Sequence, residues 1–291
     1  MKLPAFSYAS PTSLEEAVAL LATGDGEAMP IAGGQSLMPV LAFRLASPSL
    51  LVDLRRIPDL DRIRIAEDGL HLGALVRWRD IEDDSRLASE FPLLAAAIEH
   101  VAHYQIRNRG TVGGSLAHAD PAAEMPGIAV ACDARISVVG SSGSRTIDAV
   151  DFFLGPLTTV LAPDELIVDV HLPPWPSDRR WGFQEFSRRR GDFAMAGVAL
   201  FYDEQAGCAA NAHIGIIGTN DRPQRLSAAE AVLNGRVVDG ETIGLVAASA
   251  SDDVEMHGDM HASAAYRRAL VGTLVERALG HAAAIDPAER E

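Results

Sequence analysis

Hydrophobic residues near the start of the chain follow first a helical and then a strand-like spacing. Leu14, Val18 and Leu21 recur on one helical face, and Thr12–Ser13 with the carboxylates that follow resembles a capping box, with Thr12 or Ser13 as N-cap. Two short apolar runs, 29–32 and 50–54, have the length of buried strands. We therefore expect a small unit of one helix and strands, built around the glycine pair that follows the first run.

The middle of the chain has a mixed pattern of the same kind. Strands are predicted over 69–74, 134–139 and 166–172, and a helix over 89–104. The apolar stripe of this helix comprises Leu93, Leu94, Ala97, Ile98 and Val101. Three prolines in 173–177 exclude both helix and sheet ladder, so this run is the expected linker.

The last third reads as a sheet followed by helices. Three apolar runs, 183–186, 195–202 and 210–218, suit an antiparallel sheet, and helices are expected over 226–234, 240–251 and 263–284. In the last helix Ser263 is the expected N-cap. Its expected apolar side comprises Tyr266, Leu270, Leu274 and Leu279.

Composition narrows the function classes. A length of 291 residues predicts two or three compact units, and 25 glycines with only 5% aromatic residues suit an α+β or α/β architecture. The formal net charge of −15 argues against a nucleic-acid partner, which would need a clustered basic face. No run of eighteen apolar residues occurs, so no membrane span is expected, and the absence of an apolar signal core at the N-terminus predicts a cytoplasmic protein.

Several groups of polar residues superficially suggest a catalytic or metal site but do not predict one. Cys132 and Cys208 cannot supply a four-thiolate cluster, and buried free thiols are the expected state. His257 and His261 have acidic neighbours, but Gly258 between them indicates a loop rather than a ligand-bearing helix. Ser115, His118 and Asp120 are too close in sequence for a nucleophile triad. We therefore predict no catalytic residue and no metal ligand in this chain.

The strongest chemical signal is a pair of glycine motifs. Residues 32–37 read AGGQSL after a predicted strand, and residues 111–116 read TVGGSL. Adjacent glycines permit positive φ, so that consecutive backbone N–H groups can converge on an anion, and a nearby Ser or Thr adds a hydroxyl donor. Either motif alone is more often an ordinary tight turn, and neither matches a Rossmann or P-loop fingerprint. Together they predict a phosphate-bearing ligand whose identity stays open.

The runs around these motifs, 31–54 and 106–126, closely resemble the FAD-binding medium subunits of molybdenum hydroxylases, and the resemblance continues at 186–200 and 261–279. That group includes carbon monoxide dehydrogenase medium subunits and the flavin domain of xanthine dehydrogenase. The resemblance implies an α+β fold: a two-subdomain FAD-binding fold of the vanillyl-alcohol-oxidase (PCMH) type, followed by a C-terminal domain of antiparallel sheet plus helices. The expected segments are 1–55 and 56–175, which clasp FAD, and 176–291, which closes over the flavin.

The resemblance also implies which residues contact FAD. The two motifs match the pyrophosphate-binding turns, Glu124 an acidic position near the sugar or phosphates, and Ile167 an apolar position near the adenine or the ring system. Phe193 matches the residue that packs on the isoalloxazine ring, Val101 approaches the other side of the ring, and Gln184 stands where xanthine dehydrogenase relatives carry a lysine. The full set of expected FAD contacts is Ala32, Gly33, Gly34, Gln35, Ser36, Leu37, Val101, Thr111, Gly113, Gly114, Ser115, Glu124, Ile167, Gln184 and Phe193.

The implied function is electron transfer within an oxidoreductase. A large subunit would hold the molybdenum cofactor and a small subunit the 2Fe–2S clusters, in a dimer of heterotrimers, and FAD on this chain would pass electrons to an external acceptor. The main alternative is a self-contained FAD-dependent oxidase or dehydrogenase, although the last third of the chain offers no clear base. A non-catalytic FAD-binding assembly protein is a third reading. The substrate and the acceptor (NAD, a quinone, oxygen or another) stay open.

Overall fold

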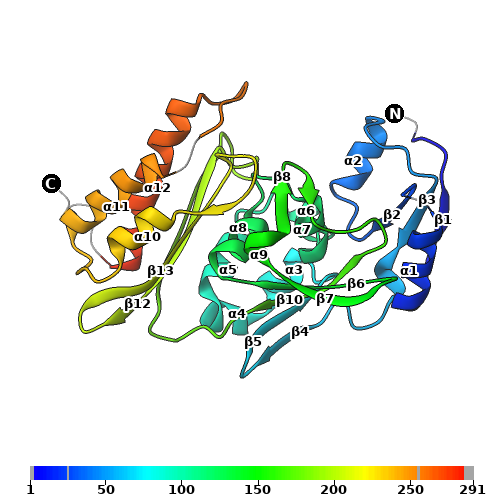
Figure 1. Ribbon diagram of the computed structural model, residues 1–291, viewed down its shortest axis with the longest axis horizontal. Helices are drawn as coiled ribbons and strands as arrows, with labels where there is room; N and C mark the ends of the chain where they lie inside the picture. The colour runs from blue at the N-terminus through cyan, green and yellow to red at the C-terminus, as the bar shows by residue number, and fades with distance from the viewer. Residues whose placement is uncertain (1–2, 25, 254–255, 285–291) are drawn as a thin grey trace. The chain divides into compact units, whose positions relative to one another are not determined.

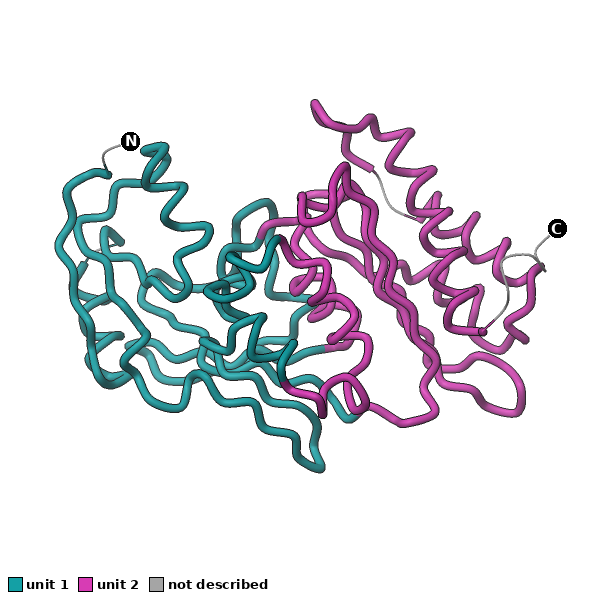
Figure 2. Tube along the Cα trace, turned by 180° about the vertical axis from the view of Figure 1, so that it is seen from behind, with its two compact units in different colours: residues 1–83, 103–119, 134–174 teal, residues 84–102, 120–133, 175–291 magenta. Residues whose placement is uncertain are grey.

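The computed structural model describes residues 3–24, 26–253 and 256–284, in which the chain folds into two compact units (Figures 1 and 2). Unit 1 comprises residues 1–83, 103–119 and 134–174, and unit 2 comprises residues 84–102, 120–133 and 175–291. The division into segments 1–55, 56–175 and 176–291 stays a prediction about domain organisation.

The first part of unit 1 is a three-stranded parallel sheet with one helix packed on it. The strand order is β1–β3–β2, with β1 at Ser7–Ala9, β2 at Ala28–Ile31 and β3 at Leu50–Asp53. Helix α1 spans Leu14–Thr23, with Ser13 as its N-cap: Ser13 Oγ accepts from Glu16 N at 3.2 Å. The Glu16 carboxylate accepts from Thr12 N, one residue before the cap, at 2.9 Å, in a variant of the expected capping box. Buried Ala17, Val18 and Leu21 join the core of this part.

The second part of unit 1 is a five-stranded antiparallel sheet of order β4–β5–β10–β6–β7. Its strands are β4 (Ile63–Ala66), β5 (Gly69–Gly73), β6 (Arg135–Gly140), β7 (Gly143–Asp148) and β10 (Leu166–Leu172). The short elements of unit 1 are α2 (Leu37–Ala42), a 3-10 helix (Leu54–Arg56), α3 (Trp78–Asp83), α6 (Tyr104–Arg107), α7 (Val112–His118), α9 (Ala149–Phe152), β8 (Phe153–Gly155) and β9 (Thr158–Thr159).

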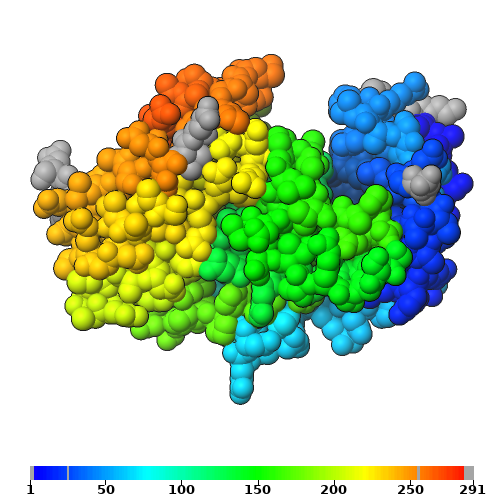
Figure 3. Space-filling model, in the orientation of Figure 1, coloured from blue at the N-terminus to red at the C-terminus, as the bar shows by residue number. Residues whose placement is uncertain are grey.

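Unit 2 is built on a four-stranded antiparallel sheet of order β11–β12–β13–β14, which confirms the expected sheet of the last third. The strands are β11 (Arg180–Phe186), β12 (Ala196–Gln205), β13 (Cys208–Ile217) and β14 (Gln224–Arg225). One face packs on α10 (Ser227–Leu233), α11 (Gly240–Asp252) and α12 (Ala264–Ala282), and the other on α5 (Pro92–Ile98) and α8 (Glu124–Ala131). Residues of α11 and α12, coloured orange, lie at the surface of unit 2 in Figure 3.

Two expectations about helices were wrong. The helix predicted over 89–104 is broken into α4 (Ser85–Glu90), α5 and α6, because Phe91 leaves the helical region at φ −141°, ψ 59° and Pro92 can only begin a new helix. In α12, Ser263 caps the helix as expected, but Tyr266 is exposed and Arg267 is buried. The Arg267 guanidinium is held inside because it donates to the carbonyl oxygens of Met195 and Gly218.

In the described ranges, no helix combines the length and the apolar character needed to cross a membrane.

Candidate functional site

The first glycine motif leaves a run of free backbone donors. Gly34 takes φ +71°, which glycine adopts without strain, and the chain then enters α2. Within the part of the chain that the structure describes, the N–H groups of Gly34, Gln35, Ser36 and Leu37 donate to no other protein atom. Consecutive unpaired N–H groups at a turn are suited to an anion such as a phosphate. This part of the sequence interpretation therefore has a geometric basis.

The second motif has a different structure from the one expected. It is the start of α7, with Thr111 as N-cap, and its N–H groups are already used. Val112 donates to Val76 O and Gly113 to Ala74 O, both at 2.9 Å, while Gly114 donates to Thr111 Oγ1 at 3.2 Å and Ser115 to Thr111 O at 3.0 Å. The expectation of converging free N–H groups was wrong for these four residues, because the backbone of unit 1 and the Thr111 cap satisfy them. The second motif can still donate hydrogen bonds to a ligand from the hydroxyl groups of Thr111 and Ser115.

Three of the four glycines are explained by close packing rather than by positive φ. A Cβ atom on Gly33 would lie 2.0 Å from Arg109 O, and one on Gly113 would lie 2.6 Å from Ala74 Cβ. A Cβ on Gly114 would lie 2.7 Å from Thr111 Oγ1 and 3.8 Å from Ala32 Cβ. The two motifs, nearly eighty residues apart in the sequence, thus lie against each other inside unit 1.

The other expected contacts are divided between the two units. Ile167 is buried on β10 of unit 1. In unit 2, Val101 is buried after α5 and Glu124 is buried as the first residue of α8. Phe193, in the loop after β11, is 68% exposed and borders a pocket of about 680 Å³ within unit 2. A large exposed aromatic beside an open pocket is available to stack on a planar ligand.

Gln184 and Glu185 point to opposite faces of the unit 2 sheet. Gln184 pairs with Val198, which belongs to the core under α10–α12. Glu185 pairs with Gly197 and so shares the other face, the one that carries α8 and Glu124. The sequence pattern did not single out Glu185. Alternate residues of a strand face opposite sides of its sheet, but only the pairing of the strands shows which side carries which helices.

The Glu124 and Glu185 carboxyl groups have unusual electrostatics. Burial raises the pKa of Glu124 to about 7, against the lowering effect of its own backbone N–H and with a smaller contribution from Asp120. Burial and then the neighbouring Glu124 raise the pKa of Glu185 to about 8. Both groups therefore favour the protonated form far more than ordinary glutamates do.

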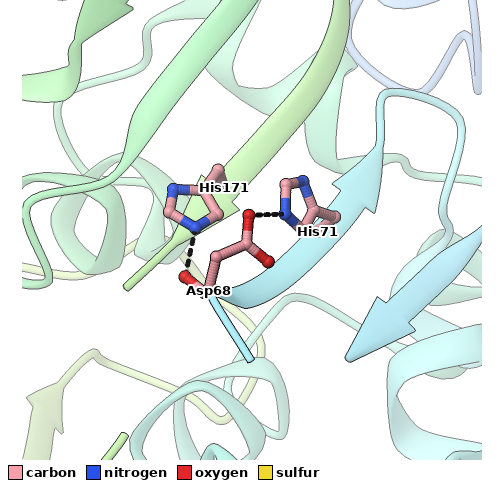
Figure 4. Close-up of side chains that lie close together, drawn as sticks. All are labelled: Asp68, His71 and His171. Atoms are coloured by element: carbon pink, nitrogen blue, oxygen red, sulfur yellow. Dashed lines mark hydrogen bonds and ion pairs between the residues drawn. The ribbon is translucent and has the colours of Figure 1, made fainter. Parts of the chain in front are cut away.

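A further polar cluster, Asp68, His71 and His171, was not anticipated (Figure 4). The two histidines are direct cross-strand partners on β5 and β10. Arg135 donates to His171 Nδ1 at 3.1 Å, so the proton of this ring lies on Nε2, which donates to Asp68 O at 2.7 Å. With its lone pair engaged by an arginine, His171 holds the β4–β5 turn against β10 rather than offering a metal ligand.

The groupings discounted from the sequence alone have the following surroundings. His257 bonds Asp221 through Nδ1 at 2.9 Å, and His261 is exposed. Glu255, one of their acidic neighbours in the sequence, lies outside the described residues. Cys132 is buried and Cys208 half-buried, both as free thiols. Burial raises the pKa of Cys132 to about 12, which leaves this thiol unreactive.

Two family models together match almost the whole chain. Residues 4–175 match the FAD binding domain in molybdopterin dehydrogenase, and residues 181–282 match the CO dehydrogenase flavoprotein C-terminal domain. The nicotine 6-hydroxylase medium subunit of Paenarthrobacter nicotinovorans is 42% identical over 284 residues, covering 98% of this chain and 99% of that protein. The carbon monoxide dehydrogenase medium chain of Hydrogenophaga pseudoflava is 33% identical over 279 residues, covering 96% and 97%.

Solved structures agree with these similarities. A chain of the carbon monoxide dehydrogenase structure from Hydrogenophaga pseudoflava superposes with a TM-score of 0.94 at 35% identity, covering 98% of this chain and 99% of that one. A chain of quinoline 2-oxidoreductase from Pseudomonas putida 86 does so with a TM-score of 0.93 at 39% identity, with the same coverage.

Proposed function

Because this chain belongs to the family of FAD-binding medium subunits of molybdenum hydroxylases, we propose that it carries electrons through FAD from iron–sulfur clusters on a partner subunit to an external acceptor. The observation that carries the proposal is the match of both family models, over residues 4–175 and 181–282, in one chain. When bound, FAD can accept electrons singly and deliver them singly or in pairs, which suits exchange between one-electron clusters and varied acceptors.

The first glycine motif fits the role of a pyrophosphate site. The free N–H groups of Gly34, Gln35, Ser36 and Leu37 would donate to phosphate oxygens, and Gly34 allows the backbone to bend around them. The second motif contributes differently: Gly113 and Gly114 let α7 approach the rest of unit 1, and Thr111 and Ser115 present hydroxyl groups there. Ala32 and Gly33 join the two motifs by packing.

Residues of unit 2, with Ile167 of unit 1, complete the proposed set of FAD contacts. The exposed Phe193 would stack on the isoalloxazine ring, Val101 would add an apolar contact, and the buried Glu124 would bind the sugar or phosphate region. Gln184 fits this set less well, because it shares the sheet face that α10–α12 cover.

We further propose that the partners are a large subunit with the molybdenum cofactor and a small subunit with 2Fe–2S clusters, in a dimer of heterotrimers located in the cytoplasm. The sequence supports a separate cluster-bearing chain, because its two cysteines fall short of the four thiolates that one cluster takes. The acceptor and the hydroxylated substrate are left open by this assignment.

The test is to isolate the native complex and to measure flavin, iron and molybdenum per copy of this chain. We expect FAD together with iron, molybdenum and two further polypeptides. Flavin alone on an assembly of identical chains that turns over a substrate would replace the proposal with the self-contained oxidase. A native complex without flavin would refute both.

A further inference from the structure

The Glu185 side chain lies on the face of the unit 2 sheet that α8 covers, in a row of three neighbouring residues on adjacent strands. Glu185, Gly197 and Ile217 are consecutive cross-strand partners on β11, β12 and β13, so their positions share one face. A Cβ atom on Gly197 would lie 2.7 Å from Ile217 Cγ1 and 3.6 Å from Glu185 Cγ. The missing side chain of Gly197 therefore makes the space that the Glu185 side chain borders.

Helix α8 brings Glu124 to the same face. A Cβ on Gly127 of α8 would lie 2.4 Å from Ile217 Cγ2, so this side of the helix rests on the row. Glu124 precedes Gly127 by three residues and lies one turn away on the same helix side. The electrostatic influence of Glu124 on Glu185 agrees with this placement.

Within the described ranges of the chain, no positively charged side chain acts on the two carboxyl groups. Glu124 is 8% exposed, and Glu185 Oε2 is buried with no hydrogen-bond donor in the described chain. The charged groups that act on them are acidic: Asp120 on Glu124, and Glu124 on Glu185. Two negative charges in such a buried place with no compensating cation are strongly disfavoured, so the pair retains a proton near neutral pH.

Among the residues that the structure describes, the other elements packed on this face add no compensating cation to the pair. At the end of α5, His100 lies edge-on to Phe183, a residue of the same face, with ring centroids 5.0 Å apart. Burial lowers the pKa of His100, and Arg190 lowers it further, so this imidazole disfavours its charged form. Strands β12 and β13 contribute Gly197 and Ile217, and the remaining residues of α8 are uncharged.

We propose that Glu124 and Glu185 form a proton-sharing carboxyl pair that couples FAD binding to protonation of the protein. The proposal rests on the proposed function, which places Glu124 near the sugar or phosphates of FAD. A protonated Glu124 would donate a hydrogen bond to the ligand, whereas an ionised Glu124 would repel the negative pyrophosphate. FAD would therefore bind more tightly at low pH than at high pH. At a pH where Glu124 is ionised in the free protein, binding of FAD would be accompanied by the uptake of about one proton.

The test uses the native complex after removal of its FAD. FAD affinity is measured from pH 6 to pH 9, and the protons taken up are counted by calorimetry at pH 8 in two buffers of different ionisation enthalpy. We expect the wild-type Kd to rise with pH, by at most about tenfold per unit for one linked proton. Glu124→Gln, a fixed mimic of the protonated form, should bind FAD at pH 6 and show a nearly flat Kd and almost no proton uptake.

Two further variants keep the outcome interpretable. Glu185→Gln removes the like charge, which makes Glu124 easier to ionise, and should therefore shift the rise in Kd to lower pH. The control is Glu204→Gln, a half-exposed glutamate on β12, which should follow the wild type. A wild-type Kd that does not change between pH 6 and pH 9 would overturn this inference and leave the proposed function intact. Failure to bind FAD at every pH would instead count against the proposed function.

Discussion

The close approach of the two glycine motifs makes Gly33→Ala the sharpest test of the site. The new Cβ atom would lie 2.0 Å from Arg109 O, 2.7 Å from Arg109 C and 3.0 Å from Gly110 Cα, all of them backbone atoms that cannot rotate away. Relieving the overlap requires a backbone shift, which also strains the hydrogen bond from Trp78 N to Gly110 O at 3.2 Å. Overpacking typically costs 1–3 kcal/mol, and the strained hydrogen bond adds about 1 kcal/mol, so we expect a loss of about 3 kcal/mol.

The assay is urea unfolding of the isolated chain, together with the FAD content of the native complex carrying the same variant. Gly34→Ala should cost less, about 1–2 kcal/mol, because its φ of +71° is unfavourable for alanine while its nearest neighbours are side-chain atoms at 3.3 Å. Gly155→Ala is the matched control, since a Cβ there would have no atom within 4 Å. If Gly33→Ala unfolded at the wild-type urea midpoint and kept its full FAD content, the packing of the motifs described above would be wrong.

Two further predictions concern ion pairs in each unit. Burial alone would raise the pKa of Asp53, but hydrogen bonds from Arg55 and Tyr8 outweigh it and lower the pKa to about 2. This stabilisation is present above the unfolded pKa of 3.8 and is lost as the pH falls towards 2. Between pH 5 and pH 2, the free energy of unfolding of the wild type, measured in urea, should therefore fall by about 2 kcal/mol more than that of Asp53→Asn. Equal losses would contradict the prediction. In unit 2, the buried Glu230 accepts from Ile214 N and Arg225 Nε, both at 2.8 Å. Glu230→Ala should therefore lower the free energy of unfolding by about 3 kcal/mol, and the exposed control Glu241→Ala by under about 1 kcal/mol. Thermal unfolding would contradict this if the control lost as much stability as Glu230→Ala.

Features that depend on neighbours along the chain were predictable from the sequence. Ser13 and Ser263 are N-caps in the structure, and each bonds a backbone N–H three residues away. The strands of the last third and the location of both glycine motifs also follow from local spacing. The resemblance to a flavoprotein family was also visible in the sequence, because it rests on continuous runs of residues, 31–54 and 106–126.

Features that depend on residues distant in sequence were decided by tertiary structure. The glycines of the second motif are needed for packing on Ala74 and Thr111, and their N–H groups are consumed, which no local pattern indicates. The contrast between Gln184 and Glu185 follows from strand register, because successive side chains alternate between faces and only the pairing with β12 assigns each face to a helix layer. The sequence by itself therefore determined the family and the positions of the two glycine motifs. The fold determined which atoms remain free to bind, since burial and hydrogen-bond partners are properties of the packed chain.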